Sequence, residues 1–246
     1  HGGPFAADSP ATRGSYLFAD LAARQADDWI DLARRGGFMF IHLHGWWRTL
    51  GHYDINPRYF PDGLEEMKAT VAKIHAAGLR AGIHTLTACI DPRDSWVTPR
   101  PSPDLIASAR YTLARPFSAE DRTLYVKEKP VPGHELVWTY SSNGNAIRIG
   151  EEIIRYSAIS HEEPYAFKEC ERGVFGTAVT AHAAGATADY LQQRYIAFYP
   201  EPDSALADEL ADAVANVYNT CGLDMLYFDG SEGMRSRYGI DTMRWK

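Results

Sequence analysis

The chain lacks several features that would each place it in a particular class of protein. No apolar run approaches the roughly 18 residues that a membrane-spanning helix needs, so we expect no membrane partner. Basic residues are in the minority, 25 against 32 acidic ones, and the formal net charge is −7. A chain of this charge offers no broad basic face to the phosphates of a nucleic acid, and a neutral or cationic small ligand fits it better.

Cysteine is scarce as well. Cys89, Cys170 and Cys221 are the three cysteines, and no two of them form a CxxC pair. Neither a zinc ribbon nor a disulfide framework is indicated, although one disulfide pair remains open. A recognisable signal segment is also missing, and the sequence begins at His1 rather than at methionine. We therefore expect a trimmed chain from a secreted or periplasmic protein.

Helix-like and strand-like segments alternate along the 246 residues, of which 45% are hydrophobic. Residues 19–35 have apolar residues at helical spacing, with Asp20 as a candidate N-cap and Gly36 and Gly37 as a stop. Residues 38–47 form an apolar run interrupted by two histidines, as expected of a strand that is covered on both faces. This part of the chain predicts one helix followed by one strand.

A second helix and strand follow. Asp62 and Glu65 have the spacing of a capping box at the start of the helix, and Gly78 marks its exit. Residues 79–86 then have the composition of a buried strand.

A third unit closes the chain. Residues 194–200 have the pattern of a strand, residues 203–220 that of a helix, and residues 223–229 that of a final strand. An alternation of this kind requires a parallel sheet with right-handed crossovers. Four strands are half of those in a (β/α)8 TIM-type barrel, which typically takes about 250 residues. We therefore predict an α/β fold that contains the first half of such a barrel.

Residues 120–190 interrupt this alternation with short β-type runs separated by Pro, Gly and Asn turns. They predict a small antiparallel β domain inserted between residues 1–119, the first part of the barrel, and residues 191–246, its continuation with the third and fourth strands. The segment that ends in the pattern RG-x-x-GT-x-x-x-AH-x-x-GA resembles a β module of phage tail proteins that is also appended to some carbohydrate-active enzymes. That resemblance implies an accessory module without chemistry of its own.

Polar and aromatic residues stand at the carboxyl end of each predicted parallel strand, where the reactive side chains of α/β barrels lie. They are His42, His44, Trp46 and Trp47 at the first strand, His84 at the second, Tyr199 at the third, and Asp229 and Glu232 at the fourth. Because side chains alternate along a strand, His42 and His44 point the same way. The sequence therefore predicts a site at this edge of the sheet.

Three stretches of the chain outside the β insert resemble the retaining α-glycosidase barrels, the superfamily of α-galactosidases, α-glucosidases and α-L-fucosidases. They are "ADDWIDLARRGGFMFIHLHGWW", "FPDGLEEMKATVAKIHAAGLRAGIH" and "GLDMLYFDG". The resemblance implies a glycoside hydrolase with a carbohydrate substrate and no cofactor or metal, in which Asp229 is the nucleophile that closes the fourth strand. It also implies that His42, His44, Trp46, Trp47, His84 and Tyr199 contact the sugar.

A retaining glycosidase needs a second carboxyl about 5–5.5 Å from the nucleophile to protonate the leaving oxygen. In α-galactosidase-like enzymes this acid comes from a later strand, and the remainder of the barrel in a longer parent chain is then an expected partner. Glu232, three residues beyond Asp229, is the candidate within this sequence. The chain also has His44 before Gly45 and Trp46 where α-galactosidases have paired aspartates, which bears on the choice of sugar.

Other readings of these residues stay open. Asp229 before Gly230 is also typical of a turn that caps the next helix. An HxH pair such as His42 and His44 is how metal-dependent amidohydrolases begin a metal site, though they need further ligands from later strands. A non-catalytic carbohydrate-binding barrel would carry the same aromatic residues.

Overall fold

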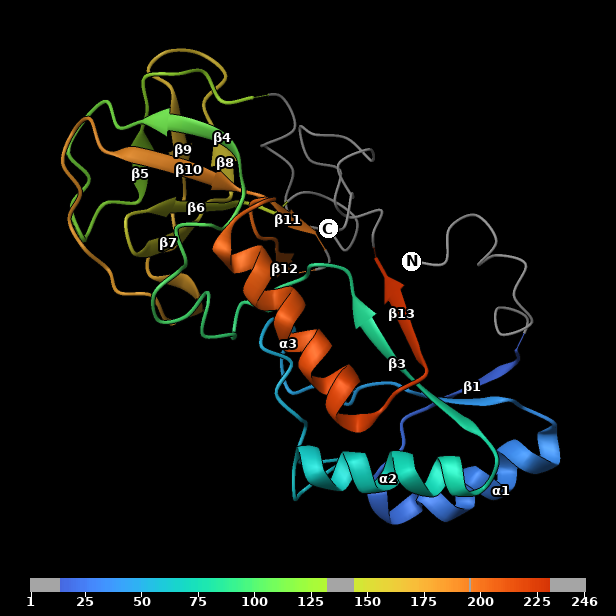
Figure 1. The fold of residues 1–246 in the computed structure, drawn as a ribbon. Coiled ribbons are helices and arrows are strands. Elements are labelled where there is room, and N and C mark those ends of the chain that lie inside the picture. The colour runs from blue at the N-terminus through green and yellow to red at the C-terminus, as the bar shows by residue number, and fades with distance from the viewer. Residues whose placement is uncertain (1–13, 132–143, 195, 231–246) are drawn as a thin grey trace. The chain divides into compact units, whose positions relative to one another are not determined.

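The computed structural model describes residues 14–131, 144–194 and 196–230 (Figure 1). The chain divides into two compact units. The first, here called the α/β unit, takes its described residues from 14–48, 53–87 and 212–229. The second, called the β unit, takes most of its described residues from 49–52 and 88–211.

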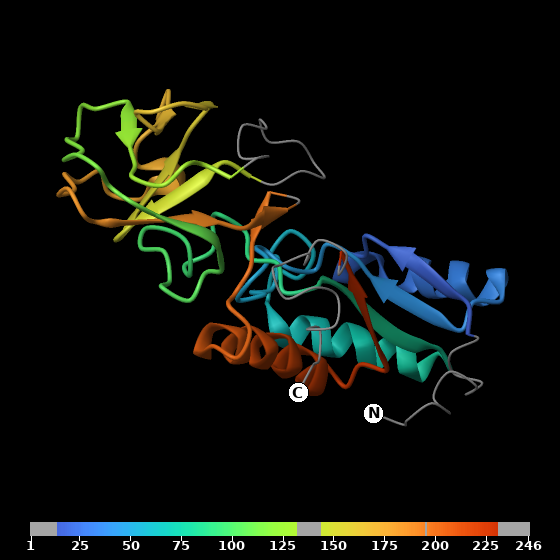
Figure 2. The same ribbon diagram turned by 90° about the horizontal axis from the view of Figure 1, so that it is seen from above.

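The α/β unit contains a four-stranded parallel sheet in the order β1-β2-β3-β13 (Figure 1). Its strands are β1 (Tyr16–Ala19), β2 (Phe40–Leu43), β3 (Arg80–Leu86) and β13 (Met225–Asp229). The connecting helices are η3 (Ala23–Gln25), α1 (Ala26–Gly36), α2 (Leu64–Ala76) and α3 (Ala205–Cys221). In Figure 2 the teal α2 helix runs along one side of this sheet. No helix in the described ranges is long and apolar enough to cross a membrane.

The two faces of this sheet have different chemistry. Ile41 and Ile83 lie on the face that carries the helices and are fully buried. On the opposite face, His42 is the cross-strand partner of Gly82. A Cβ atom at Gly82 would lie 2.9 Å from the Nδ1 atom of His42, so the absence of a side chain at this position makes room for the imidazole.

Several of the predicted elements are present. Strand β3 and helix α3 fall within a residue or two of their expected limits, and helix α2 ends before Gly78, which has a φ of 80°. The expected capping box is wrong in detail. The N-cap of α2 is Gly63, and the main-chain N–H of Asp62 donates to the Oε2 atom of Glu66, at 3.0 Å, rather than to Glu65.

The first strand of the sheet is missing from the sequence prediction. Strand β1 is only four residues long and runs into apolar residues at helical spacing, so its end was assigned to the following helix. Asp20 is consequently not the N-cap of that helix, because helix α1 starts after Gln25. The strand predicted at residues 38–47 is β2, the second in the sheet, and it ends at Leu43.

The prediction that residues 194–200 form the third parallel strand is wrong. In the described part of this segment, β11 (Gln193–Arg194) and β12 (Ala197–Phe198) pair with each other in antiparallel fashion and form a separate two-stranded sheet. Aromatic and β-branched residues suit either kind of strand, and the tertiary pairing decides between them. Strand β13 remains the fourth of the parallel strands along the chain, because β1 replaces the strand that is lost.

The β unit consists mainly of two antiparallel sheets, in the orders β4-β10-β6-β7 and β5-β9-β8. Their strands are β4 (Ala107–Thr112), β5 (Thr123–Tyr125), β6 (Ala146–Ile149), β7 (Glu152–Arg155), β8 (Ala158–Ile159), β9 (Ala166–Lys168) and β10 (Thr187–Leu191), with the short helix η4 (Val174–Gly176). Antiparallel pairing is what the short β-type runs predicted.

The RG-x-x-GT-x-x-x-AH pattern forms a buried polar network in the β unit. Glu152 is fully buried, and its carboxylate accepts hydrogen bonds from Arg172 Nε at 2.7 Å and Arg172 Nη2 at 2.9 Å, and lies 2.7 Å from His182 Nε2. The main-chain N–H groups of Gly173 and Thr180 donate to the same carboxylate. These contacts give the pattern a structural role, and its likeness to a phage tail module stays a prediction.

This network predicts a large loss of stability for Glu152→Gln. Burial raises the pKa of Glu152, but the hydrogen bonds from Arg172 and His182 outweigh it, and the pKa lies below its ordinary value of 4.5. A pKa that is lower in the folded protein stabilises the fold above pH 4.5, and this contribution disappears as the pH falls through the folded-state value. At neutral pH we expect the variant to lose roughly 3–5 kcal/mol in urea unfolding.

The difference between Glu152→Gln and the wild type should shrink in acid. The matched control is Glu171→Gln, which removes an exposed partner of Arg155 and should cost less than about 1 kcal/mol. Equal losses for the two variants would contradict a special role for Glu152.

Candidate functional site

The candidate site lies at the carboxyl edge of the parallel sheet in the α/β unit. His84 is near the end of β3 and Asp229 ends β13, while Asp20 and His44 follow directly after β1 and β2. Because all four strands run in the same direction, their carboxyl ends meet at one edge. The fold thereby brings together groups that are far apart in the sequence.

Asp229 and His84 form one of two carboxylate–imidazole pairs at this edge. The Nε2 atom of His84 lies 3.2 Å from Oδ2 of Asp229, and the carboxylate side chain is 49% exposed. Burial lowers the pKa of His84, while the hydrogen bond to Asp229 raises it, and the net shift is downward. The neutral tautomer with its proton on Nε2 therefore fits this contact, donating to the carboxylate.

Two aromatic rings hold the imidazole of His84 in place. Trp47 stacks on it with ring centroids 5.6 Å apart, and Tyr227 stacks on it at 5.7 Å. With little freedom to rotate, the His84 ring presents its Nε2 atom to Asp229 in a fixed direction. Trp47 is half-buried, so it also offers surface to a ligand.

Asp20 and His44 form the second pair. The Oδ1 atom of Asp20 lies 2.9 Å from Nδ1 of His44, and both side chains are exposed. The rings of His44 and His84 have centroids 4.9 Å apart, which places the two pairs side by side. Sequence reasoning gave Asp20 a capping role, and recognition of "YLFA" as a strand would have placed it at the sheet edge.

His42 lies two residues before His44 and has a different environment. Its ring is fully buried and contacts the rings of Phe18, Tyr227 and His84. Neither ring nitrogen has a hydrogen-bond partner among the described residues. Burial, reinforced by the nearby imidazoles of His84 and His44, lowers its pKa to about 4, so His42 is neutral at physiological pH.

The adjacent residues Trp46 and Trp47 differ in burial and therefore in role. Trp46 is fully buried, its indole N–H donates to the main-chain oxygen of His84 at 2.8 Å, and its ring stacks on Tyr53. It therefore fixes the end of β3 from inside the protein. Only Trp47 of the pair has surface to offer.

The other two predicted site residues, Tyr199 and Glu232, do not belong to the described part of the α/β unit. Tyr199 belongs to the β unit, where its side chain is buried and its hydroxyl lies 3.5 Å from Cys89 Sγ. Glu232 lies outside the described residues.

Metal binding was the alternative use of His42 and His44. Within residues 14–131, 144–194 and 196–230, no group of three or more His, Cys, Asp or Glu side chains is arranged to hold a metal ion. The Nδ1 atom of His44 is already engaged by Asp20.

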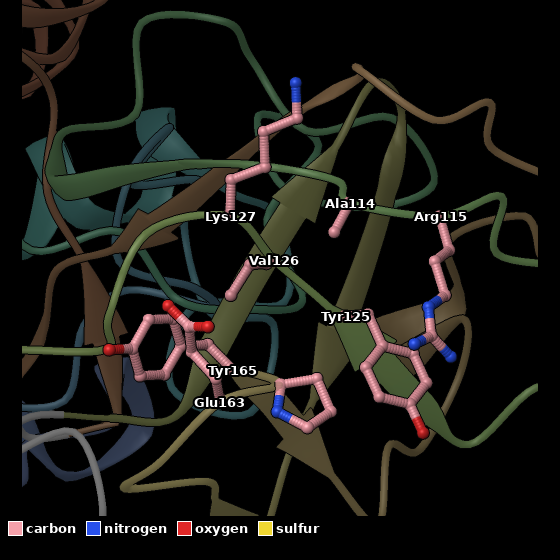
Figure 3. Close-up of a pocket in the computed structure, with 8 residues that line it drawn as sticks. Ala114, Arg115, Tyr125, Val126, Lys127, Glu163 and Tyr165 are labelled. Carbon is pink, nitrogen blue, oxygen red and sulfur yellow. The ribbon is translucent and has the colours of Figure 1, made fainter.

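The β unit carries a separate surface pocket of about 300 Å³ (Figure 3). Arg115 lies over the ring of Tyr125 at 4.2 Å on one side, and Glu163 and Tyr165 line the other. The pocket holds no carboxylate–imidazole pair and is therefore a weaker catalytic candidate than the sheet edge.

No protein family and no curated protein matches the sequence. Among solved structures, the chain is similar to a trehalulose synthase (TM-score 0.50, 12% identity, 91% of this chain and 36% of that one). It is also similar to an isomaltulose synthase from Erwinia rhapontici (0.48, 10%, 89% and 35%) and an α-galactosidase from Lactobacillus brevis (0.46, 14%, 88% and 20%). The chain thus spans about a fifth to a third of the length of these proteins.

At an identity of 12%, the likeness to the trehalulose synthase concerns the fold alone. This likeness of fold agrees with the parallel β/α units of the α/β unit.

The buried His42 predicts a pH-dependent stability. Its pKa falls from 6.5 to about 4 on folding. Between pH 6.5 and pH 4, His42 is therefore protonated in the unfolded chain and neutral in the folded protein. Stability is complete above pH 6.5 and decreases as the pH falls toward 4, by up to about 3 kcal/mol. Urea unfolding of His42→Leu should show a flatter profile in this window than the wild type. His161→Leu, at an exposed histidine, should leave the profile unchanged; an equal flattening there would contradict the assignment.

Proposed function

We propose that this chain carries the nucleophile of a glycoside hydrolase that cleaves a glycosidic bond in an oligo- or polysaccharide with retention. The observation that carries the proposal is the half-exposed carboxylate of Asp229 at the end of the fourth parallel strand, held by His84 at 3.2 Å. In parallel α/β barrels, reacting groups occupy this position.

The reaction is a double displacement. A carboxylate oxygen of Asp229 attacks the anomeric carbon while the bond to the leaving oxygen breaks, and a second carboxyl gives that oxygen its proton. Water then gives a proton back to the second carboxyl and attacks the anomeric carbon, which breaks the bond to Asp229 and releases its carboxylate. Glu232 remains the sequence-based candidate for the second carboxyl.

His84 is the positioning group in this proposal. By donating to Oδ2 of Asp229 it restricts rotation of the half-exposed carboxylate. The rings of Trp47 and Tyr227 keep the imidazole in this orientation. Attack then needs little reorganisation of the site.

The substrate contacts follow from what is exposed. Asp20 and His44 offer hydrogen-bonding groups to sugar hydroxyls, and the half-buried Trp47 offers an aromatic face to the C–H side of a sugar ring. His42 and Trp46 are buried and support the site from within. The likeness of fold to a trehalulose synthase supports a saccharide ligand by analogy.

The first test is Asp229→Asn. Aryl α- and β-glycosides of galactose, fucose, glucose and arabinose should reveal turnover by the wild type, and the amide should abolish it because it cannot form the glycosyl-enzyme ester. Circular dichroism should show an unchanged fold. Full turnover by a folded variant would remove Asp229 from the mechanism, and sugar binding without any wild-type turnover would favour a non-catalytic carbohydrate-binding protein.

The second test is His84→Phe, which keeps an aromatic ring between Trp47 and Tyr227 but removes the donor to Asp229. A hydrogen bond to a charged group is worth about 1.5–3 kcal/mol, so we expect kcat to fall roughly 10- to 150-fold. The matched control is His75→Phe, because His75 forms a comparable 2.8 Å pair with Asp224, the residue before β13. A loss of kcat as large in the control would show a general effect on the fold.

A further inference from the structure

Another carboxylate–imidazole pair lies in the β unit and is built from Asp94 and His52. The side chain of Asp94 is only 1% exposed. Its Oδ1 atom lies 2.7 Å from Nδ1 of His52 and accepts the main-chain N–H of Trp96 at 3.0 Å. Its Oδ2 atom accepts the main-chain N–H of His52 at 3.0 Å and the Thr49 hydroxyl at 3.1 Å.

The backbone at Gly51 leaves room for the carboxylate of Asp94. Gly51 has a φ of 119°, and a Cβ atom there would lie 2.7 Å from Asp94. A larger residue would therefore be strained and would also displace the carboxylate.

Asp94 can hold residues 49–52 and 94–96 together without the imidazole of His52. The main-chain groups of His52 and Trp96 and the hydroxyl of Thr49 already tie the segments together through Asp94. The bond to Nδ1 adds a fixed tautomer and orientation for the His52 ring, which is 37% exposed. With the proton on Nδ1, the Nε2 atom carries a lone pair, and it has no protein partner among the described residues.

Trp96 completes the arrangement. Its ring stacks on His52 with centroids 3.8 Å apart, and it packs against the apolar cluster that includes Val97 and Phe198. The indole N–H of this half-buried residue has no hydrogen-bond partner in the described structure. A fixed acceptor and a fixed donor thus lie next to each other.

Nucleophilic catalysis does not fit this geometry. Ser95 Oγ lies 3.3 Å from His52, but from the same Nδ1 atom that Asp94 engages. A Ser-His-Asp triad needs the serine on the other ring nitrogen. A metal would lack further protein ligands, because no group of three ligating side chains exists in the described ranges.

We propose that His52 and Trp96 form an accessory saccharide-binding subsite, with His52 Nε2 accepting from one sugar hydroxyl and the Trp96 indole donating to another sugar oxygen. Segment 49–52 follows β2 and segment 88–96 follows β3, and loops that leave the carboxyl ends of barrel strands carry substrate contacts. The ligand class rests on the proposed function, whereas the orientation of the two groups does not.

The test uses the full chain with Asp229→Asn, titrated with raffinose, isomaltulose and maltotriose. The NMR signal of the Trp96 indole N–H, identified by its loss in Trp96→Phe, should shift with at least one of these sugars. Adding His52→Phe, which keeps the stacked ring but removes Nε2, should weaken that Kd about tenfold. The matched control His161→Phe, at an exposed histidine of the same unit, should leave Kd unchanged.

The outcomes separate the two proposals. A shift of the Trp96 signal that depends on His52, without turnover of any glycoside by the wild type, supports the subsite and removes the hydrolase. Turnover by the wild type without such a shift, or a Kd that His52→Phe leaves unchanged, overturns the subsite and leaves Asp229 in place. Absence of both turnover and any shift overturns both.

Discussion

The register of the parallel sheet is the constraint on which the site depends. Pairing of His84 with Tyr227, and of His42 with Gly82, places the imidazoles and the aromatic rings on one face. A slip of one residue would turn these side chains toward the helices and bring apolar residues such as Ile83 into the site. The apolar face that the helices bury therefore stabilises the fold and at the same time keeps Asp229 and His84 within reach of each other.

Three of the carboxylate–histidine contacts in the described residues, those of Glu152, Asp229 and Asp94, differ in exposure, and exposure separates their roles. Glu152 and its partners are sealed inside the β unit and act as a structural network. Asp229 is half exposed beside a buried imidazole, whereas Asp94 is buried beside a half-exposed one. In the proposed hydrolase the carboxylate of Asp229 would face the substrate, and in the proposed subsite the imidazole of His52 would face a sugar. In the two aspartate–histidine pairs, the buried and the exposed partner are thus exchanged.

Periodicity was sufficient to predict helices α2 and α3 and strand β3, because each is long enough to show its repeat. It missed β1, which has four residues, and it placed residues 194–200 in the parallel sheet although their pairing is antiparallel. His44, His84 and Asp229, which were predicted from their positions at strand ends, lie at the carboxyl edge of the sheet, and their role at a site stays a prediction. The partners Asp20 and Asp94, and the burial of Trp46, depend on contacts between distant segments that no local pattern records.

The contact between His84 and Asp229 joins residues 145 positions apart, with the described strands of the β unit between them. Synthesis proceeds from the N-terminus, so both histidine-bearing strands and the whole insert emerge before the strand that ends in Asp229. Closing so long a loop is slow compared with local pairing. The carboxylate therefore meets its imidazole only after the last described strand has been made, and a nascent chain that stops before Asp229 lacks this pair.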